Sequence, residues 1–301
     1  MKKSEIIFVI LISAILWCIK GQAQYLPQVI AEEKITISTR DAKNFVEVYT
    51  QDVSKKDLKE FYLGKASIAM DEKVMRSFVQ KLNKFTKTVK TDYQTYKSVE
   101  NVLDKLVQEE IELRVALENW KKLSPNALLP DVYFAVGQQN LAEAFSHGNL
   151  VINLARLHAR GGQDSPNSVN PHALDDVTLY PQVLRSIIGT QFYGCNAEAE
   201  SSLAKAIKEG SKDFLVELIS GENPNAEIFS YAASRKDEIL SLFQEQMYTD
   251  NMNNWYAPSQ RKSERLARWV GYQVAADFYQ EATDKSQAIQ TILKVKNYDC
   301  F

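Results

Sequence analysis

The sequence predicts an α+β fold that is mostly helical, with a small β-sheet beside a pair of helices. Three observations lead to this prediction. Amphipathic segments fill the first half of the chain, two short runs of β-branched and aromatic residues follow, and amphipathic segments then return. The hydrophobic fraction of 45% is sufficient for a packed core.

The first 23 residues have the pattern of a cleavable signal peptide. A basic start precedes an apolar run from Ile6 to Trp17, and Gly21-Gln22-Ala23 supplies small residues before a cleavage site. The run is short for a membrane span, and an uncleaved anchor is the alternative. Lipidation of Cys18 is not expected, because Trp17 precedes it where a small residue is usual. We therefore expect residues 24–301 to be one periplasmic or secreted domain with no stable membrane span.

Charge and cysteine content narrow the classes of partner. Without residues 1–23, which carry three lysines and one glutamate, the net charge is about −4. This balance provides no attraction to nucleic acid or to anionic lipid. Cys195 and Cys300 remain after processing, and a disulfide between them in an exported chain would tie down the C-terminus. Their positions in the sequence do not show whether the two side chains meet.

The first half of the chain, about residues 40–123, is predicted to be helical after a short strand over 35–39. A helix begins after Asp41, and apolar residues at spacings of three and four predict a helix over 71–88. Another helix is expected over 98–123, with Ser98 as its N-cap.

The region from about 129 to 221 is predicted to hold the sheet and the site. Strands are expected over 132–136 and 149–152, separated by a loop over 138–148. After a polar loop over 161–172, we expect helices over 181–193 and 197–220, the second ended by Gly221. The C-terminal part, 227–295, is predicted to form helices over 227–250, 263–281 and 286–295.

Glu209 and Asp213 lie one turn apart on the predicted helix 197–220. Such a pair suits a metal-binding carboxylate with a second carboxylate behind it. The alternative is a solvated acidic stripe that continues to Glu217 and pairs with nearby lysines, namely Lys205, Lys208 and Lys212. The chain contains no H-E-x-x-H motif, which such a zinc site would normally include.

Three ordered stretches carry a resemblance to a known family: 129–137, then 207–214 with 217–221, and finally 269–272 followed by 284–289. On these stretches the chain resembles the predicted zinc-dependent peptidases related to the bacterial gliding-motility lipoprotein B. The resemblance spans most of the mature chain. It implies a gluzincin-like helix pair in the fold and a Bacteroidetes-type source.

The resemblance also implies where a metal site would lie. The family pattern places H-E-x-x-H at 185–189, so that Arg185 replaces the first histidine, Ser186 the general base and Gly189 the second histidine. Of the metal ligands that the family pattern implies, only the glutamate is present in this sequence, as Glu209 with Asp213 behind it. Because catalytic zinc normally takes three protein ligands, we expect no cofactor. We hypothesise that Arg185 pairs with Glu209 in place of the metal.

These observations predict a catalytically inactive, metallopeptidase-like pseudoenzyme that keeps a peptide-sized cleft. Its expected partner is a peptide or a protein of the cell envelope. One alternative is an active zinc-dependent hydrolase whose ligands lie outside the motif, Glu209 with His147, His158 or His172. A second alternative is a structural component of the envelope. The sequence identifies neither the ligand nor the partner.

Overall fold

The computed structural model describes residues 35–138, 142–161, 178–192, 201–247 and 261–294. The predicted signal peptide, Cys195, Cys300 and His172 lie outside the described residues, and so does the side chain of His158. Two compact units are present. Of the described residues, those within 35–115 and 128–187 form the sheet unit, and those within 116–127 and 188–294 belong to the helical unit. Each is described by itself, and the expectation of one domain stays a prediction.

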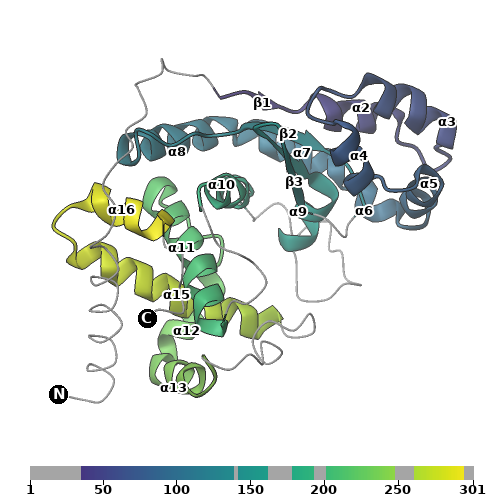
Figure 1. Ribbon diagram of the computed structural model, residues 1–301. Helices are drawn as coiled ribbons and strands as arrows, with labels where there is room; N and C mark the ends of the chain where they lie inside the picture. Colours follow the sequence, from purple (N-terminus) through teal and green to yellow (C-terminus); the bar gives the residue numbers. More distant parts are fainter. Residues whose placement is uncertain (1–34, 139–141, 162–177, 193–200, 248–260, 295–301) are drawn as a thin grey trace. The chain divides into compact units, whose positions relative to one another are not determined.

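The fold class is confirmed as α+β, because the sheet unit holds a four-stranded mixed sheet among many helices (Figure 1). Its strand order is β1-β2-β4-β3, with β1 and β4 parallel to β2 and β3 antiparallel to β4. The bounds are β1 Ile37–Ser38, β2 Asp131–Ala135, β3 Glu143–Ser146 and β4 Asn149–Asn153.

The strand β3 corrects the prediction of a loop over 138–148. It is joined to β4 by the two-residue turn His147-Gly148, in which φ is 50° and 80°. Positive φ at both central residues defines the primed turn that matches the twist of a β-hairpin, and glycine adopts it without steric cost. The sequence signal is weak because histidine stands where asparagine or aspartate is usual.

The sheet unit also contains several helices and turns (Figure 1). They are α2 Arg40–Val48, α3 Lys55–Asp57, the π turn Leu58–Tyr62, the 3-10 turn Leu63–Lys65, α4 Glu72–Phe78, α5 Leu82–Thr91, α6 Tyr93–Lys97, α7 Val99–Gln108 and α9 Leu154–Gly161. The helix α10 covers Tyr180–Gly189, and its last two residues belong to the helical unit. The helix α8 covers Glu110–Leu123.

An aromatic cluster forms the core under α2. Phe45, Tyr62, Phe85 and Tyr96 are buried, and the Phe45 and Tyr62 rings meet edge to face with centroids 5.3 Å apart. The Tyr62 hydroxyl donates to the carbonyl of Val136 at 2.6 Å and accepts from its N–H at 2.9 Å. Burial raises the pKa of Tyr62. The N–H and the carbonyl of Val136, just after β2, therefore both have hydrogen-bond partners inside the core.

The prediction of one continuous helix over 71–88 is wrong. The segment forms two helices, α4 and α5, which are separated at Gln80, whose φ is 55°. The released carbonyls at the end of α4 gain partners from the chain that follows β2. Gln138 donates its backbone N–H to Phe78 O at 2.8 Å and its Nε2 to Val79 O at 2.9 Å. A contact distant in the sequence therefore stabilises the break.

The predicted helix over 98–123 also divides, into α7 and α8 at Glu109. The Glu109 carboxylate accepts the N–H groups of Leu179 and Tyr180 at 2.8 and 2.7 Å, at the start of α10. Ser98 occupies the N-cap position, but its hydroxyl donates to Thr95 O, so side-chain capping by Ser98 is wrong. Burial raises the pKa of Glu109, and the two N–H groups oppose that rise.

In the part that the structure describes, the helical unit contains α11 Ser202–Ser220, α12 Ala226–Ser234, α13 Lys236–Gln246, α15 Arg261–Glu281 and α16 Lys285–Lys294, together with the end of α8 and the last two residues of α10. The predicted stop at Gly221 is confirmed by its φ of 77°. The predicted helix over 227–250 is wrong in its continuity, because it divides at Arg235.

The helices α11 and α15 cross with their backbones in contact (Figure 1). A Cβ added to Gly210 would lie 2.2 Å from Tyr272 N, and one added to Gly271 would lie 1.8 Å from Ala206 O. Two of the three sequence stretches behind the family resemblance therefore meet at this crossing. Among the described helices, none has the length and apolarity needed to cross a membrane.

Candidate functional site

The residues predicted for the degenerate metal site lie on α10 and α11. Arg185 and Ser186 are half-buried on α10, and Gly189 is the last residue of that helix. Glu209 is half-buried on α11, and Asp213 is fully buried one turn further on. The pairing of Arg185 with Glu209 stays a prediction.

Glu209 has a cationic partner inside α11. Its Oε1 lies 2.6 Å from Nζ of Lys212, and both side chains are largely buried, with 20% and 14% of their surfaces exposed. A Cβ added to Gly189 would lie 3.9 Å from Lys212 Cε and 4.0 Å from Nζ. The position that the resemblance assigns to the second histidine therefore faces the lysine that pairs with Glu209.

The carboxylates further along α11 accept hydrogen bonds from the loop that follows the helix. Asn225 Nδ2 donates to Asp213 Oδ2 at 3.0 Å, and Asn223 Nδ2 donates to Glu217 Oε2 at 2.6 Å. Tyr272 of α15 also donates its hydroxyl to Glu217, and burial together with this carboxylate raises the pKa of Tyr272. The exposed acidic stripe offered as an alternative is therefore wrong for Asp213, because its side chain is buried.

Sequence reasoning missed the roles of Asn223, Asn225 and Tyr272. Asparagine commonly supplies side-chain hydrogen bonds in turns. The two asparagines that follow the end of the helix at Gly221 could therefore have indicated hydrogen bonds from this loop. Nothing in the local sequence indicates that Tyr272, 55 residues beyond Glu217, lies beside it.

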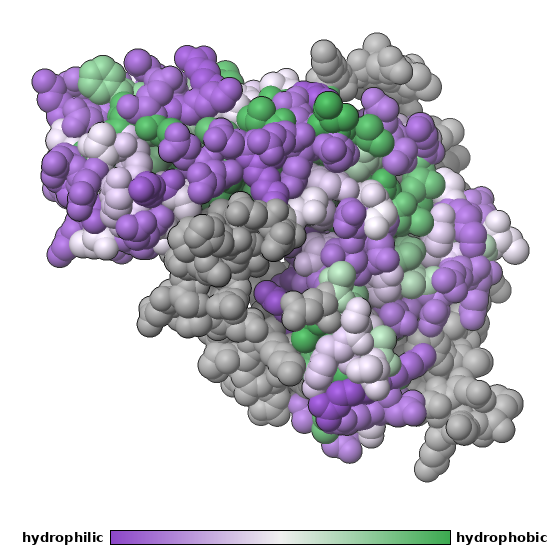
Figure 2. Space-filling view, turned by 180° about the vertical axis from the view of Figure 1, so that it is seen from behind, coloured by the Kyte–Doolittle hydropathy of each residue, from purple (hydrophilic) through white to green (hydrophobic). Residues whose placement is uncertain are grey.

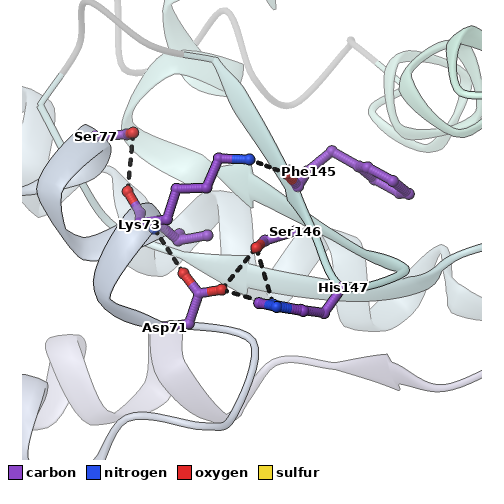
Figure 3. Close-up of polar contacts among 7 residues, drawn as sticks. Asp71, Lys73, Ser77, Phe145, Ser146 and His147 are labelled. Carbon is purple, nitrogen blue, oxygen red and sulfur yellow. Dashed lines mark hydrogen bonds and ion pairs between the residues drawn. The ribbon is translucent and has the colours of Figure 1, made fainter.

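A second polar cluster lies in the sheet unit, where the β3–β4 turn meets the start of α4 (Figure 3). Ser146 Oγ donates to Asp71 Oδ2 at 2.6 Å, and His147 Nδ1 lies 3.1 Å from the same oxygen. Asp71 Oδ1 accepts the N–H of Val74 at 2.8 Å and so caps α4. These hydrogen bonds, that from Ser146 first, lower the pKa of Asp71 to about 2.

This serine, histidine and aspartate do not form a hydrolytic triad. In a triad the serine and the aspartate contact different ring nitrogens of the histidine. Here Nδ1 of His147 faces both Ser146 Oγ, at 3.1 Å, and Asp71. Ser146 Oγ donates its one hydrogen to the carboxylate, so the ring does not accept it. The cluster connects the hairpin to α4 and leaves His147 with 84% of its side chain exposed.

A hollow of about 410 Å³ lies beside the edge strand β1. It is lined by Ile37, Ser38, Thr39, Arg40, Lys43, Asn44 and Glu47. Its lining is mainly polar and carries two basic residues and one acidic residue, all from α2. Sequence reasoning did not identify this place, because it forms where β1 and α2 meet.

Within the described part of the chain, no group of three His, Cys, Asp or Glu side chains is placed to hold a metal ion. His147, one of the histidines weighed as a ligand with Glu209, has Asp71 and Ser146 as its contacts in the sheet unit.

Comparison with known proteins extends over most of the chain. A family model described as gliding motility protein GldB matches residues 26–301. No match is found among curated proteins or among solved structures.

Proposed function

The chain belongs to the gliding motility protein GldB family, and from this membership we propose that it acts in the cell envelope as a non-catalytic binding protein of gliding motility. The alternative hypothesis is that the chain is an active zinc-dependent hydrolase. The two differ in what the carboxylates of α11 do, so the proposal depends on the partners of these side chains.

The ion pair between Glu209 and Lys212 is the observation that carries the proposal. A zinc ligand must offer a carboxylate oxygen to the metal, and here the ammonium lies 2.6 Å from Oε1. A divalent ion at that oxygen would be repelled by the ammonium, and the repulsion is strong where little water screens it. Glu209 is thus neutralised by its own helix.

The other carboxylates of α11 support the same conclusion. Asp213 and Glu217 accept hydrogen bonds from asparagine amides, which are neutral donors that hold the loop after the helix. Such contacts stabilise the helical unit and do not prepare an open coordination position.

The hollow beside β1 supports binding. An edge strand can accept an extended peptide through its unpaired backbone groups, and side chains beside it then give specificity. Arg40 and Lys43 would favour a peptide with acidic side chains.

Zinc content and hydrolysis test the proposal against the enzyme reading. The purified mature chain should hold no stoichiometric zinc after equilibration with the metal, and it should leave a broad peptide library uncleaved. Stoichiometric zinc that is lost in Glu209→Gln, together with cleavage that depends on Glu209, would establish the hydrolase instead.

Binding is tested with peptides selected from a random library on the full mature chain. Selected peptides should bind at least ten times more weakly to Lys43→Glu than to the parent chain. Lys294→Glu, an exposed change at the end of α16, should leave binding unchanged. Equal affinity for the parent and for Lys43→Glu would exclude the hollow as the binding place.

A further inference from the structure

A strongly basic segment lies in the sheet unit and contains α5. Residues 73–91 have no aspartate or glutamate and carry six basic side chains: Lys73, Arg76, Lys81, Lys84, Lys87 and Lys90. This segment has a net charge of +6 in a chain whose total is −2, so the rest of the chain carries −8. The expectation of no attraction to anionic lipid depends on the total charge, which is an average and does not describe this segment.

The lysines of α5 lie opposite the side that packs in the core. Phe85 and Val89 are buried, and because an α-helix turns by about 100° per residue, Lys87 lies nearly opposite both. Lys84 and Lys90 are about 60° to either side of Lys87. All three lysines are exposed. The helix therefore presents lysines to solvent along its whole outer side.

The charges on this side of α5 are not balanced within the described part of the protein. Lys81, the N-cap residue, is also exposed, and the basic face of α5 consists of Lys81, Lys84, Lys87 and Lys90. Arg76 of α4 pairs with Glu72, but no carboxylate of the described residues lies within ion-pair distance of the basic face. Like charges one turn apart disfavour a helix. An anionic partner would offset this cost.

The basic face suits a broad anionic surface better than a single small anion. Its helical lysines diverge at intervals of about 60°, so they do not converge on one point. Their long stems can still bring the ammonium groups to a common plane. At the left of Figure 2, where α3, α4 and α5 lie, most residues are hydrophilic. The apolar residues of α5 are buried or half-buried, so charge alone would make the contact.

We propose that the basic face of α5 binds the anionic phospholipid headgroups of a membrane in the cell envelope. The helix would lie along the bilayer surface, with its ammonium groups against the phosphates and without insertion into the hydrocarbon. The proposal takes from the proposed function only the location in the envelope. It involves neither zinc, nor hydrolysis, nor the hollow beside β1.

Co-sedimentation of the purified mature chain with lipid vesicles tests this proposal. Vesicles of phosphatidylglycerol mixed with an equal amount of phosphatidylcholine should bind the chain, and vesicles of phosphatidylcholine alone should not. Affinity should fall at least tenfold when the ionic strength is raised from about 0.05 M to about 0.5 M, because salt screens the attraction. Equal binding to the two kinds of vesicle would overturn the proposal.

A pair of triple variants separates the basic face from the charge of the whole chain. The test variant replaces three lysines of α5: Lys84→Gln, Lys87→Gln and Lys90→Gln. It should bind anionic vesicles at least ten times more weakly than the parent. The matched control removes the same charge from exposed lysines of the helical unit: Lys122→Gln, Lys285→Gln and Lys294→Gln. The control should bind like the parent, and equal losses in the two variants would contradict the proposal.

Two further measurements keep the test decisive. Replacing the same three lysines of α5 by arginine keeps the charge and should preserve binding, which separates lost attraction from a lost fold. Retention on immobilised heparin without binding to anionic vesicles would identify a sulfated polysaccharide as the kind of partner and exclude the lipid surface. Neither result changes the zinc and peptide tests of the proposed function, so the two proposals can fail separately.

Discussion

The Glu209 and Lys212 side chains form an ion pair within α11, with 2.6 Å between Oε1 and Nζ. Both side chains are largely buried, so the pair is poorly screened by water. This relationship places a positive charge beside the carboxylate that the family resemblance assigns to a metal.

Removing the ammonium should destabilise the protein. Lys212→Met removes the ammonium that lies beside the largely buried Glu209 carboxylate, and we expect a loss of about 1–3 kcal/mol of unfolding free energy. The double variant Lys212→Met with Glu209→Gln should recover much of this loss. Urea denaturation of both single variants and the double variant measures the coupling. The exposed Arg76–Glu72 pair is the control and should contribute no more than about 1 kcal/mol. Strictly additive losses at 209 and 212 would contradict the prediction.

The hypothesis that Arg185 also pairs with Glu209 is tested by a parallel cycle. Arg185→Ala should cost roughly 3–5 kcal/mol if the guanidinium balances a buried carboxylate, and adding Glu209→Gln should restore much of it. The measurement is again urea denaturation of the single and double variants. If the losses at positions 185 and 209 are additive, Arg185 does not pair with Glu209, and the hypothesis is wrong.

The crossing of α11 and α15 should not tolerate a methyl group. Gly271→Ala and Gly210→Ala should each lower the unfolding free energy by more than about 3 kcal/mol, because the added Cβ would overlap the backbone of the facing helix. Thermal and denaturant unfolding measure the effect. Gly189→Ala is a matched control, because its Cβ would meet Lys212 Cε at an ordinary 3.9 Å. That variant should be neutral or slightly more stable, since alanine favours helix over glycine. Wild-type stability in Gly271→Ala would refute the close crossing.

Asp71→Asn should make the stability of the protein less dependent on pH in acid. The folded-state pKa of Asp71 is about 2, below its ordinary value of 3.8, so the carboxylate stabilises the fold fully above about pH 4. This contribution is lost as the pH falls through the folded-state pKa. Urea midpoints measured between pH 5 and pH 2 should therefore fall less steeply in Asp71→Asn than in the parent. Glu72→Gln, at the neighbouring exposed carboxylate, is the control. Identical slopes for the parent and Asp71→Asn would rule out this role.

The mature N-terminus is predicted to be Gln24. The small residues of Gly21-Gln22-Ala23 direct cleavage after Ala23, and Trp17 disfavours lipid attachment at Cys18. N-terminal sequencing of protein from the native host, with radiolabelled palmitate supplied during growth, measures both. A labelled chain that begins at Cys18 would show a lipoprotein, and a chain that retains Met1 would show an uncleaved anchor.

Much of the helical content could be predicted because apolar spacing follows the helix period within one segment. The helix α11 shows this well, since its end at Gly221 is encoded locally. The breaks at Gln80 and Glu109 could not be predicted, because their partners, Gln138 and the start of α10, are distant in the sequence. The strand β3 was missed for a related reason, since its pairing with β4 depends on an unusual His-Gly turn.

The sequence by itself determined the α+β class, the position of the acidic residues on α11 and the absence of an H-E-x-x-H motif. It could not determine which groups these acids contact, because a three- or four-residue spacing fits an exposed stripe and a buried site equally well. Only the tertiary structure decided that Asp213 is buried against Asn225, and that Gly189 faces the lysine beside Glu209. The physical reason is that burial and charge pairing depend on neighbours that the folded chain brings together from separate segments.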